Sequence, residues 1–376
     1  MISFNEPPFI GDELEYIKDA IEKKHICGDG LYTKKCNTLL EKMTGSHKAL
    51  LTNSGTAALE MSALILDIKP GDEVICPSFT FCTTVSSFAL RGAKIIFVDI
   101  RDDTLNLDEQ QLEAAITPKT KAIVPVHYAG VCAEMDTILQ IANKYNIPVV
   151  EDAAQAVGSR YKGKSAGSMG VMGCYSFHET KNISSGEGGA LLINTPNLTE
   201  TAEIIREKGT NRSKFFRGQV DKYTWIALGS SYLPSDMIAA YLYPQLEKIE
   251  KINNQRMTLW NKYHQAFSEL ENKGVRRPYC PNECTHNAHM YYLRCPSLED
   301  RTKFIATMKE KGICCVFHYL PLHSSPAGLQ YGQTIGDMKT TNFVGDTLVR
   351  LPLFYSLSEK DQNYIIENIL DYWNKK

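Results

Sequence analysis

Short apolar runs alternate with helix-like stretches between about residue 48 and residue 193, and this alternation constrains the fold more than any other feature of the chain. Strand-like runs occur at residues 72–77, 93–100, 121–128, 147–153, 173–177 and 189–194. Helix-like stretches occur at 56–68, 108–116 and 134–145. This order predicts an α/β fold with a mainly parallel sheet sandwiched by helices. In such a sheet, ligands bind at the carboxyl ends of the strands.

The C-terminal third has a different pattern. A long helical stretch at 235–273 contains Pro244, which predicts a kink or a break, and shorter mixed segments follow it. We therefore expect a large α/β domain over residues 1–250 and a smaller α+β domain over residues 251–376. A chain of 376 residues is long enough for two domains.

Charge and composition argue against several classes of partner. The 41 Lys and Arg residues nearly balance the 43 Asp and Glu residues, so charge gives no reason to expect nucleic acid or a membrane surface. No apolar run reaches the roughly 18–20 residues that cross a bilayer. The 11 cysteines lack the spacing of a disulfide framework or a zinc site, so we expect reduced thiols, a cytoplasmic protein and no metal.

Two polar groups stand where the predicted sheet would bind a ligand. Asp152 ends the strand-like run 147–153, where it could cap a helix or keep a ligand nitrogen protonated. The sequence Ser54-Gly55-Thr56 precedes a helix-like run and could present backbone N–H groups to an anion, although an ordinary helix cap is the alternative. It is not a Walker loop, because no Gly-Lys-Ser/Thr follows it.

Lys181 is the third candidate. It lies between the strand-like run 173–177 and the glycine turn 186–189. Most lysines are solvated surface charges, but the end of a buried strand can partly desolvate an amine, as a nucleophilic amine requires. The glycine turn lacks the third glycine of a dinucleotide-binding fingerprint and precedes a strand-like run, which argues against a nicotinamide cofactor.

An anion cradle, a strand-end aspartate and a strand-end lysine are together the groups that pyridoxal 5'-phosphate (PLP) requires. The lysine forms a Schiff base with the cofactor, and the aspartate partners its ring nitrogen. The three occur in this order between Ser54 and Lys181. The combination predicts a PLP site more specifically than any one of its members.

With these motifs, the chain resembles the DegT/StrS family of PLP-dependent sugar aminotransferases, which have the type I aminotransferase fold. The matching stretches cover nearly the whole chain and include SGTAAL, GDEVICPSFTF, EDAAQA, SFHETKNISSGEGGA and PLHSSPA. Others, such as CGDGLYTKKC and VFHYLPLH, look most like members that aminate dTDP-4-keto-6-deoxyglucose at C4 with L-glutamate as donor. Amination at C3 or of a UDP-sugar is the main alternative, and a non-catalytic regulator that kept the fold is a weaker one.

The resemblance implies roles for individual residues. Lys181 would carry the cofactor and shuttle protons, and its presence argues against the family's sugar 3-dehydratases, in which histidine replaces this lysine. Asp152 would hold the ring nitrogen, Gln155 would lie near the ring's phenolic oxygen, and Phe81 would stack on the ring. The remaining implied cofactor contacts are Ser54, Gly55, Thr56, Ser176 and Ser231.

The substrate contacts are less defined by the resemblance, which also implies a homodimer with active sites at its interface. Many members carry an Asn-Tyr-Arg run that reaches the cofactor phosphate of the partner subunit, where this chain has Ser-Tyr-Leu at 231–233. The residue that holds the glutamate carboxylate is therefore open, with Arg212 and Arg217 as candidates and solvated loop arginines as the alternative. The other implied substrate contacts are Asp29, Tyr32, His178 and Tyr319, and His318 and His323 could line the sugar side.

Overall fold

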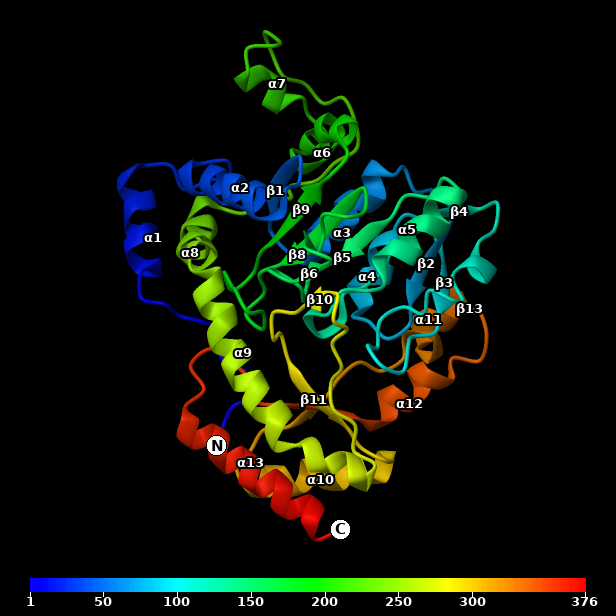
Figure 1. Cartoon of the computed structure of the whole chain (residues 1–376). Helices are drawn as coiled ribbons and strands as arrows, with labels where there is room; N and C mark the ends of the chain where they lie inside the picture. Colours follow the sequence, from blue (N-terminus) through cyan, green and yellow to red (C-terminus); the bar gives the residue numbers. More distant parts are fainter.

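The computed structural model describes residues 1–376 and has one large mixed sheet at its centre (Figure 1). In spatial order the strands are β13 (Gly332–Thr334), β3 (Lys94–Val98), β2 (Glu73–Pro77), β4 (Thr120–Ile123), β5 (Val150–Asp152), β8 (Met172–Ser176), β9 (Gly189–Ile193) and β1 (Lys48–Thr52). Two parallel bridges, Ile123 to Val149 and Val126 to Asp152, join β4 to β5. Only β9 is antiparallel, to both β8 and β1, so the sheet is mainly parallel as predicted.

Helices cover both faces of this sheet. Ile95 and Ile96 are adjacent on β3 and therefore point to opposite faces, yet both are buried, in two different apolar clusters. One cluster contains side chains of α2 (Leu31–Thr44), α5 (Met135–Lys144) and α8 (Asp236–Glu247), and the other contains side chains of α3 (Gly55–Ile65) and α6 (Thr199–Arg206), with part of α4 (Cys82–Ala89). None of the helices has both the length and the apolar composition needed to cross a membrane.

Two local predictions differ from the structure. The stretch 108–116 forms only the 3₁₀ turn Glu113–Ala115, because its backbone hydrogen bonds run between residues three apart, such as Gln111 N to Asp108 O and Leu112 N to Glu109 O. Pro244 stays inside α8, and the break comes at Lys248, directly before α9 (Ile249–Ala266). The stretch is therefore broken, as predicted, but four residues after the proline, whose carbonyl accepts a hydrogen bond from Lys248 N at 3.2 Å at the end of α8.

The C-terminal third is α+β. Its antiparallel sheet has the order β11 (Tyr291–Arg294), β14 (Leu348–Leu351) and β12 (Val316–Phe317), and it packs with α9, α10 (Leu298–Glu310) and α13 (Glu359–Asn374) around Trp373. The remaining α-helices here are α11 (Pro326–Tyr331) and α12 (Lys339–Thr347). Segments cross between the two parts: β13 pairs with β3 of the large sheet, and Ile2 bridges to Ile313. The division at residue 250 stays a prediction.

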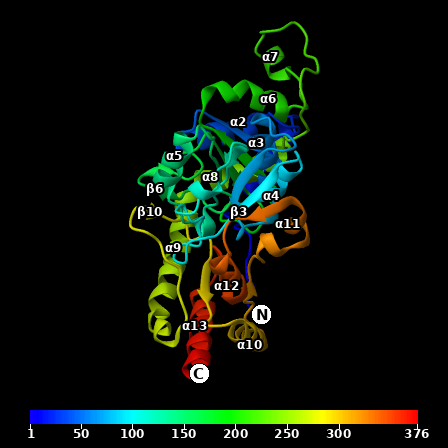
Figure 2. The same ribbon diagram turned by 90° about the vertical axis from the view of Figure 1, so that its right-hand side faces the viewer.

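Residues 207–231, which include α7 (Arg212–Phe216), form an arm that projects from the α/β body, as Figures 1 and 2 show. Its exposed apolar side chains include Phe216 (67 %), Trp225 (71 %) and Leu228 (60 %). The other elements are α1 (Glu13–Glu22) and a small sheet of β10 (Cys284–Thr285), β6 (Arg160–Tyr161) and β7 (Lys164–Ser165).

Candidate active site

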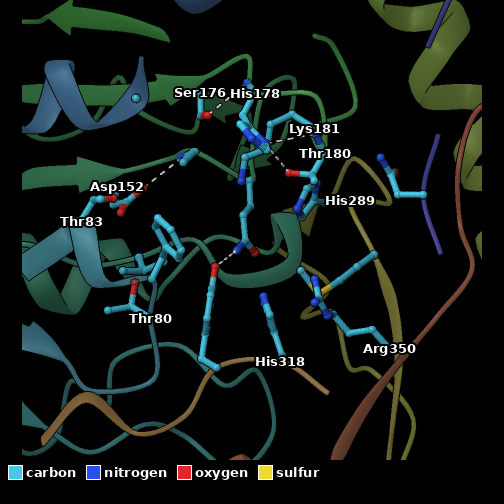
Figure 3. Close-up of a pocket in the computed structure, with 18 of the residues that line it drawn as sticks. Thr80, Thr83, Asp152, Ser176, His178, Thr180, Lys181, His289, His318 and Arg350 are labelled. Atoms are coloured by element: carbon cyan, nitrogen blue, oxygen red, sulfur yellow. Dashed lines mark hydrogen bonds between the residues drawn. The ribbon is translucent and has the colours of Figure 1, made fainter. Parts of the chain in front are cut away.

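A cavity of about 640 Å³ lies between the large sheet and the C-terminal third (Figure 3). We call its first side the sheet wall, which includes Ser54, Gly55, Thr56, Thr80, Phe81, Asp152, Gln155, Ser176, His178 and Lys181. We call the opposite side the C-terminal wall, which includes Phe4, His289, Phe317, His318, Tyr319 and Arg350. The carboxyl ends of β5 and β8 supply the sheet wall, as the strand-end rule predicts.

An anion-binding cradle forms at the start of α3. Ser54 caps this helix, because its Oγ accepts from Ala57 N at 3.0 Å, and the first intrahelical bond runs from Ala58 N to Ser54 O. The N–H groups of Gly55 and Thr56 precede that bond and are free for an anion. Gly55 lies against Ser176, since a Cβ on Gly55 would stand 2.9 Å from the Ser176 Cβ.

The glycine turn after Lys181 supports this cradle from behind. A Cβ on Gly189 would stand 2.4 Å from the carbonyl carbon of Ser54, closer than any side chain can pack. Gly186 has a φ of +78°, the left-handed region that favours glycine, and has open space beside it. The turn is therefore a bend and a packing surface for the cradle, not a loop that binds the anion itself.

Asp152 is held rigidly at the end of β5. Only 5 % of the residue is exposed, its Oδ2 accepts from Thr84 Oγ1 at 2.6 Å, and its Oδ1 accepts from Ala154 N at 3.1 Å. Thr84 Oγ1 also lies 2.8 Å from Thr80 Oγ1. This buried, oriented carboxylate is suited to hold a cationic ring nitrogen.

Lys181 projects into the same cavity from the loop after β8, where its backbone N donates to His178 O at 2.9 Å. Burial is the main cause that lowers the pKa of its amine to about 8; the Asp152 charge opposes this shift, and the Arg350 charge adds to it. A neutral amine is therefore accessible near neutral pH, as nucleophilic and proton-transfer roles both require.

Gln155 connects the two walls. Its Oε1 accepts from Ala129 N at 2.7 Å, and its Nε2 donates to Tyr319 Oη at 2.8 Å. The Tyr319 ring stacks on His318 with centroids 3.6 Å apart. Phe81 lines the cavity with 55 % of its area exposed, so its face is available for a flat ligand. His178 also lines the cavity, where its Nδ1 lies 3.0 Å from Thr180 Oγ1.

His289 is a cavity residue that the sequence did not indicate. The side-chain amide of Asn182 donates to Asn287 O at 2.7 Å, so its Oδ1 is left to accept from His289 Nδ1 at 3.0 Å. This places the ring proton on Nδ1 and leaves Nε2 as an acceptor facing the cavity. Burial, followed by the charge of Lys181, lowers the pKa of His289 well below its usual value and keeps the ring neutral.

Arg350 is the second cavity residue that the sequence reasoning missed. It lies on β14, and its Nε and Nη2 donate to the carbonyl of Phe317 at 3.3 and 3.1 Å. Its guanidinium lies 4.5 Å from the centroid of the Phe4 ring. A charged residue within the apolar run Leu348–Leu353 was the signal that could have found it.

Other predicted contacts lie outside the cavity of this chain: Asp29, Tyr32, Arg212, Arg217, Ser231 and His323. Tyr32 is buried in helix packing, and its hydroxyl donates to Asp19 Oδ2. Ser231 lies on the arm, where its carbonyl accepts from Asn53 Nδ2 at 3.2 Å. His323 is bound to Ser78, with Nδ1 2.7 Å from Oγ.

The two loop arginines are paired with carboxylates at the base of the arm. Arg217 forms a bidentate pair with Glu203 at 3.0 and 2.9 Å, and Arg212 Nη1 donates to Glu207 Oε2 at 2.9 Å. Asp29 accepts from Arg206 beside them. Burial disfavours the charged form of Asp29, but Arg206 outweighs it and holds the pKa of Asp29 below its usual value. None of these arginines can hold a carboxylate in the cavity of its own chain.

Comparisons with known proteins agree with this geometry. Residues 9–370 match the DegT/DnrJ/EryC1/StrS aminotransferase family. An uncharacterized protein of Methanocaldococcus jannaschii is 36 % identical over 366 residues, 94 % of each chain. The aminotransferase TlmJ of Streptoalloteichus hindustanus has a TM-score of 0.90 at 27 % identity, covering 98 % of both chains. Spr1654 of Streptococcus pneumoniae, solved with PLP and with PMP, has a TM-score of 0.92 in its PMP form at 28 % identity, covering both chains fully.

The predicted cofactor and fold are thus confirmed at the level of the family, since the fold extends over the whole chain and the cradle, carboxylate and lysine share one cavity. The chain belongs to the DegT/DnrJ/EryC1/StrS family and is a PLP-dependent sugar aminotransferase with the type I fold.

Proposed function

We propose that the enzyme transfers the amino group of L-glutamate to C4 of dTDP-4-keto-6-deoxyglucose, giving dTDP-4-amino-4,6-dideoxygalactose and 2-oxoglutarate. The observation that carries the proposal of transamination is that Lys181 opens into the same cavity as buried Asp152 and the anion cradle. The choice of sugar and of position C4 rests on the sequence likeness of stretches such as 27–36 and 316–323 to dTDP-4-amino-4,6-dideoxygalactose transaminase.

The sheet wall has the groups that would hold PLP. We assign the phosphate to the N–H groups of Gly55 and Thr56 and to the hydroxyls of Ser54 and Ser176. Asp152 would accept from the ring nitrogen and keep it protonated, and Phe81 would pack against the ring face. When bound, PLP supplies a conjugated ring that accepts the electron pair left at a deprotonated substrate carbon.

Lys181 would carry the proton in both halves of the reaction. Its Nζ takes a proton from the α-carbon of the amino donor as general base and returns a proton to the sugar carbon as general acid. A pKa of about 8 allows both forms of the amine to exist near neutral pH. Burial lowers the pKa of His289 well below its usual value, so its ring is a weaker base than the Lys181 amine.

A homodimer with active sites at the interface would complete the site, and the exposed apolar side chains of the arm support it. In that assembly, Ser231, Arg212 and the other arm residues would face the partner's cavity. Equilibrium sedimentation tests the proposal: a monomer at micromolar concentration would contradict it.

The main test is incubation with dTDP-4-keto-6-deoxyglucose and L-glutamate, followed by NMR of the product. An axial amine at C4 is expected. Amination at C3, or turnover of a UDP-sugar instead, would favour the competing sugar aminotransferases. If the chain binds PLP but shows no absorption band that borohydride removes, the cofactor forms no Schiff base with Lys181. That result would favour the non-catalytic regulator.

A further inference from the structure

Arg350 is a cation in the cavity without a carboxylate partner. No Asp or Glu lies within ion-pair distance of its guanidinium, and the protein groups that it contacts are the Phe317 carbonyl and the Phe4 ring. Its Nη1 makes no hydrogen bond to the protein. The guanidinium is half-buried, and burial disfavours an unpaired charge. Its free Nη1 can donate hydrogen bonds to a ligand anion, which would supply the missing partner.

The cavity that Arg350 shares with Lys181 narrows the choice of anion. Both side chains line it, and the charge of Arg350 lowers the pKa of the Lys181 amine. An amino donor must bring its own nitrogen to the place of the Lys181 nitrogen, and its α-carboxylate is bonded to the same carbon as that nitrogen. The side-chain carboxylate of glutamate is two carbons farther away. The cofactor phosphate has its own cradle, which Figure 3 places across the pocket at Ser176.

We propose that Arg350 binds the α-carboxylate of the amino donor, and that Phe4 and the Phe317 carbonyl hold the guanidinium when the uncharged hexose ring of the nucleotide sugar occupies the reacting position. The inference rests on the proposed function, because it requires an α-amino acid as donor. It replaces Arg212 and Arg217, which are paired with carboxylates outside the cavity.

Phe4 explains how one site accepts two unlike substrates. During the sugar half of the reaction no carboxylate is present, and an unpaired arginine would be costly in the cavity. The ring of Phe4 lies 4.5 Å from the guanidinium, and the carbonyl of Phe4 accepts from Leu353 N at 3.4 Å, which ties the N-terminal segment to the end of β14. The cation–π contact therefore gives Arg350 a resting partner that a carboxylate can supplement.

The test measures the amino-donor half-reaction alone, as the absorbance change of the PLP-loaded enzyme on mixing with L-glutamate, its α-amide or its γ-amide. Wild type is expected to react with the α-amide about 100-fold more slowly than with glutamate, since the amide cannot pair with the guanidinium. Arg350→Gln is expected to slow glutamate by about 100-fold but the α-amide by less than about 3-fold. Arg276→Gln, at an exposed arginine outside both the cavity and the arm, is the matched control and should change neither rate.

A second readout does not depend on catalysis. Glutarate, which has no amine to react, is titrated into the PLP-loaded enzyme by calorimetry. Arg350→Gln is expected to weaken its binding at least about 30-fold, and Phe4→Leu, which keeps an apolar side chain without a π face, about 3- to 10-fold. Unchanged binding in Phe4→Leu would overturn the role of Phe4.

Two outcomes would overturn the assignment of Arg350. Equal slowing of glutamate and its α-amide in Arg350→Gln would indicate general damage to the site. Loss of discrimination against the γ-amide alone would place the side-chain carboxylate on Arg350. If wild type does not react with glutamate, the proposed donor is wrong, and the same comparison of acid and α-amide is made with the amino acid that does react.

Discussion

The sheet wall and the C-terminal wall of the cavity differ in how far apart along the sequence their residues lie: those of the sheet wall fall between Ser54 and Lys181, and those of the C-terminal wall between Phe4 and Arg350. On the sheet wall, Asp152 ends β5, and Lys181 follows β8, which pairs with β5. The cradle is three consecutive residues at the start of α3. The C-terminal wall joins Phe4, His289, His318 and Arg350, which come from distant parts of the chain. In the proposed reaction, the first wall would provide the chemistry that both substrates need, and the second would provide contacts that differ between the substrates.

This comparison predicts that sheet-wall substitutions impair both half-reactions, whereas C-terminal-wall substitutions separate them. Lys181→Ala is the strongest test. We expect the amino-donor and sugar half-reactions each to fall at least about 1,000-fold, because the proton carrier is lost from both. Single-turnover absorbance measures each half separately, and Lys303→Ala on the exposed surface of α10 is the control. A Lys181→Ala enzyme with wild-type turnover would refute the scheme.

Asp152→Asn is expected to have the next largest effect. The amide keeps the shape and can still accept from Thr84, but it has no charge to hold a protonated ring nitrogen. Both half-reactions should slow by about 100-fold. Thr84→Val removes one hydrogen bond to the carboxylate but keeps its charge, so it should slow them less. A loss confined to one substrate would show that Asp152 belongs with the substrate contacts instead.

Gly189→Ala tests whether the glycine turn supports the cradle. The new methyl group would press on the Ser54 carbonyl, so we expect PLP affinity to fall about 10-fold, measured by equilibrium dialysis. Gly186→Ala is the matched variant, since it strains a residue with φ of +78° but touches nothing. It should lower stability by about 1 kcal/mol and leave PLP affinity unchanged. If both variants lose PLP affinity equally, the loss in Gly189→Ala does not come from its contact with the cradle.

The sheet wall could be predicted from the sequence because its signals are local. Apolar runs predicted β2, β3, β5, β8 and β9, and strand-end placement then selected Asp152 and Lys181. Local signals failed at 108–116, where the backbone forms successive turns with hydrogen bonds between residues three apart instead of an α-helix. They also could not show that β9 runs antiparallel or that β13 joins β3, because strand pairing depends on distant segments.

The C-terminal wall could not be predicted in the same way. Arg350 lies in the cavity because β14 pairs between β11 and β12, and the tautomer of His289 depends on the hydrogen bonds of Asn182. Arg212 and Arg217 were chosen as carboxylate ligands from their loop, but Glu207 and Glu203 pair with them. The sequence of a loop shows that it contains arginines, but it does not show which of them lack a carboxylate partner in the folded chain.

The smallest expected effect tests whether the two walls are coupled by charge. In the protein without cofactor, labelling of Lys181 by acetic anhydride should rise with pH around a midpoint of about 8, because only the neutral amine reacts and burial lowers its pKa. Arg350→Gln removes a cation that disfavours the ammonium form and should move the midpoint upward. Asp152→Asn removes an anion that favours the ammonium form and should move it downward.

Mass spectrometry of the peptide that contains Lys181 measures both shifts, with exposed Lys303 as the internal reference. Two shifts of the same sign would mean that the substitutions act through the structure of the cavity and not through charge.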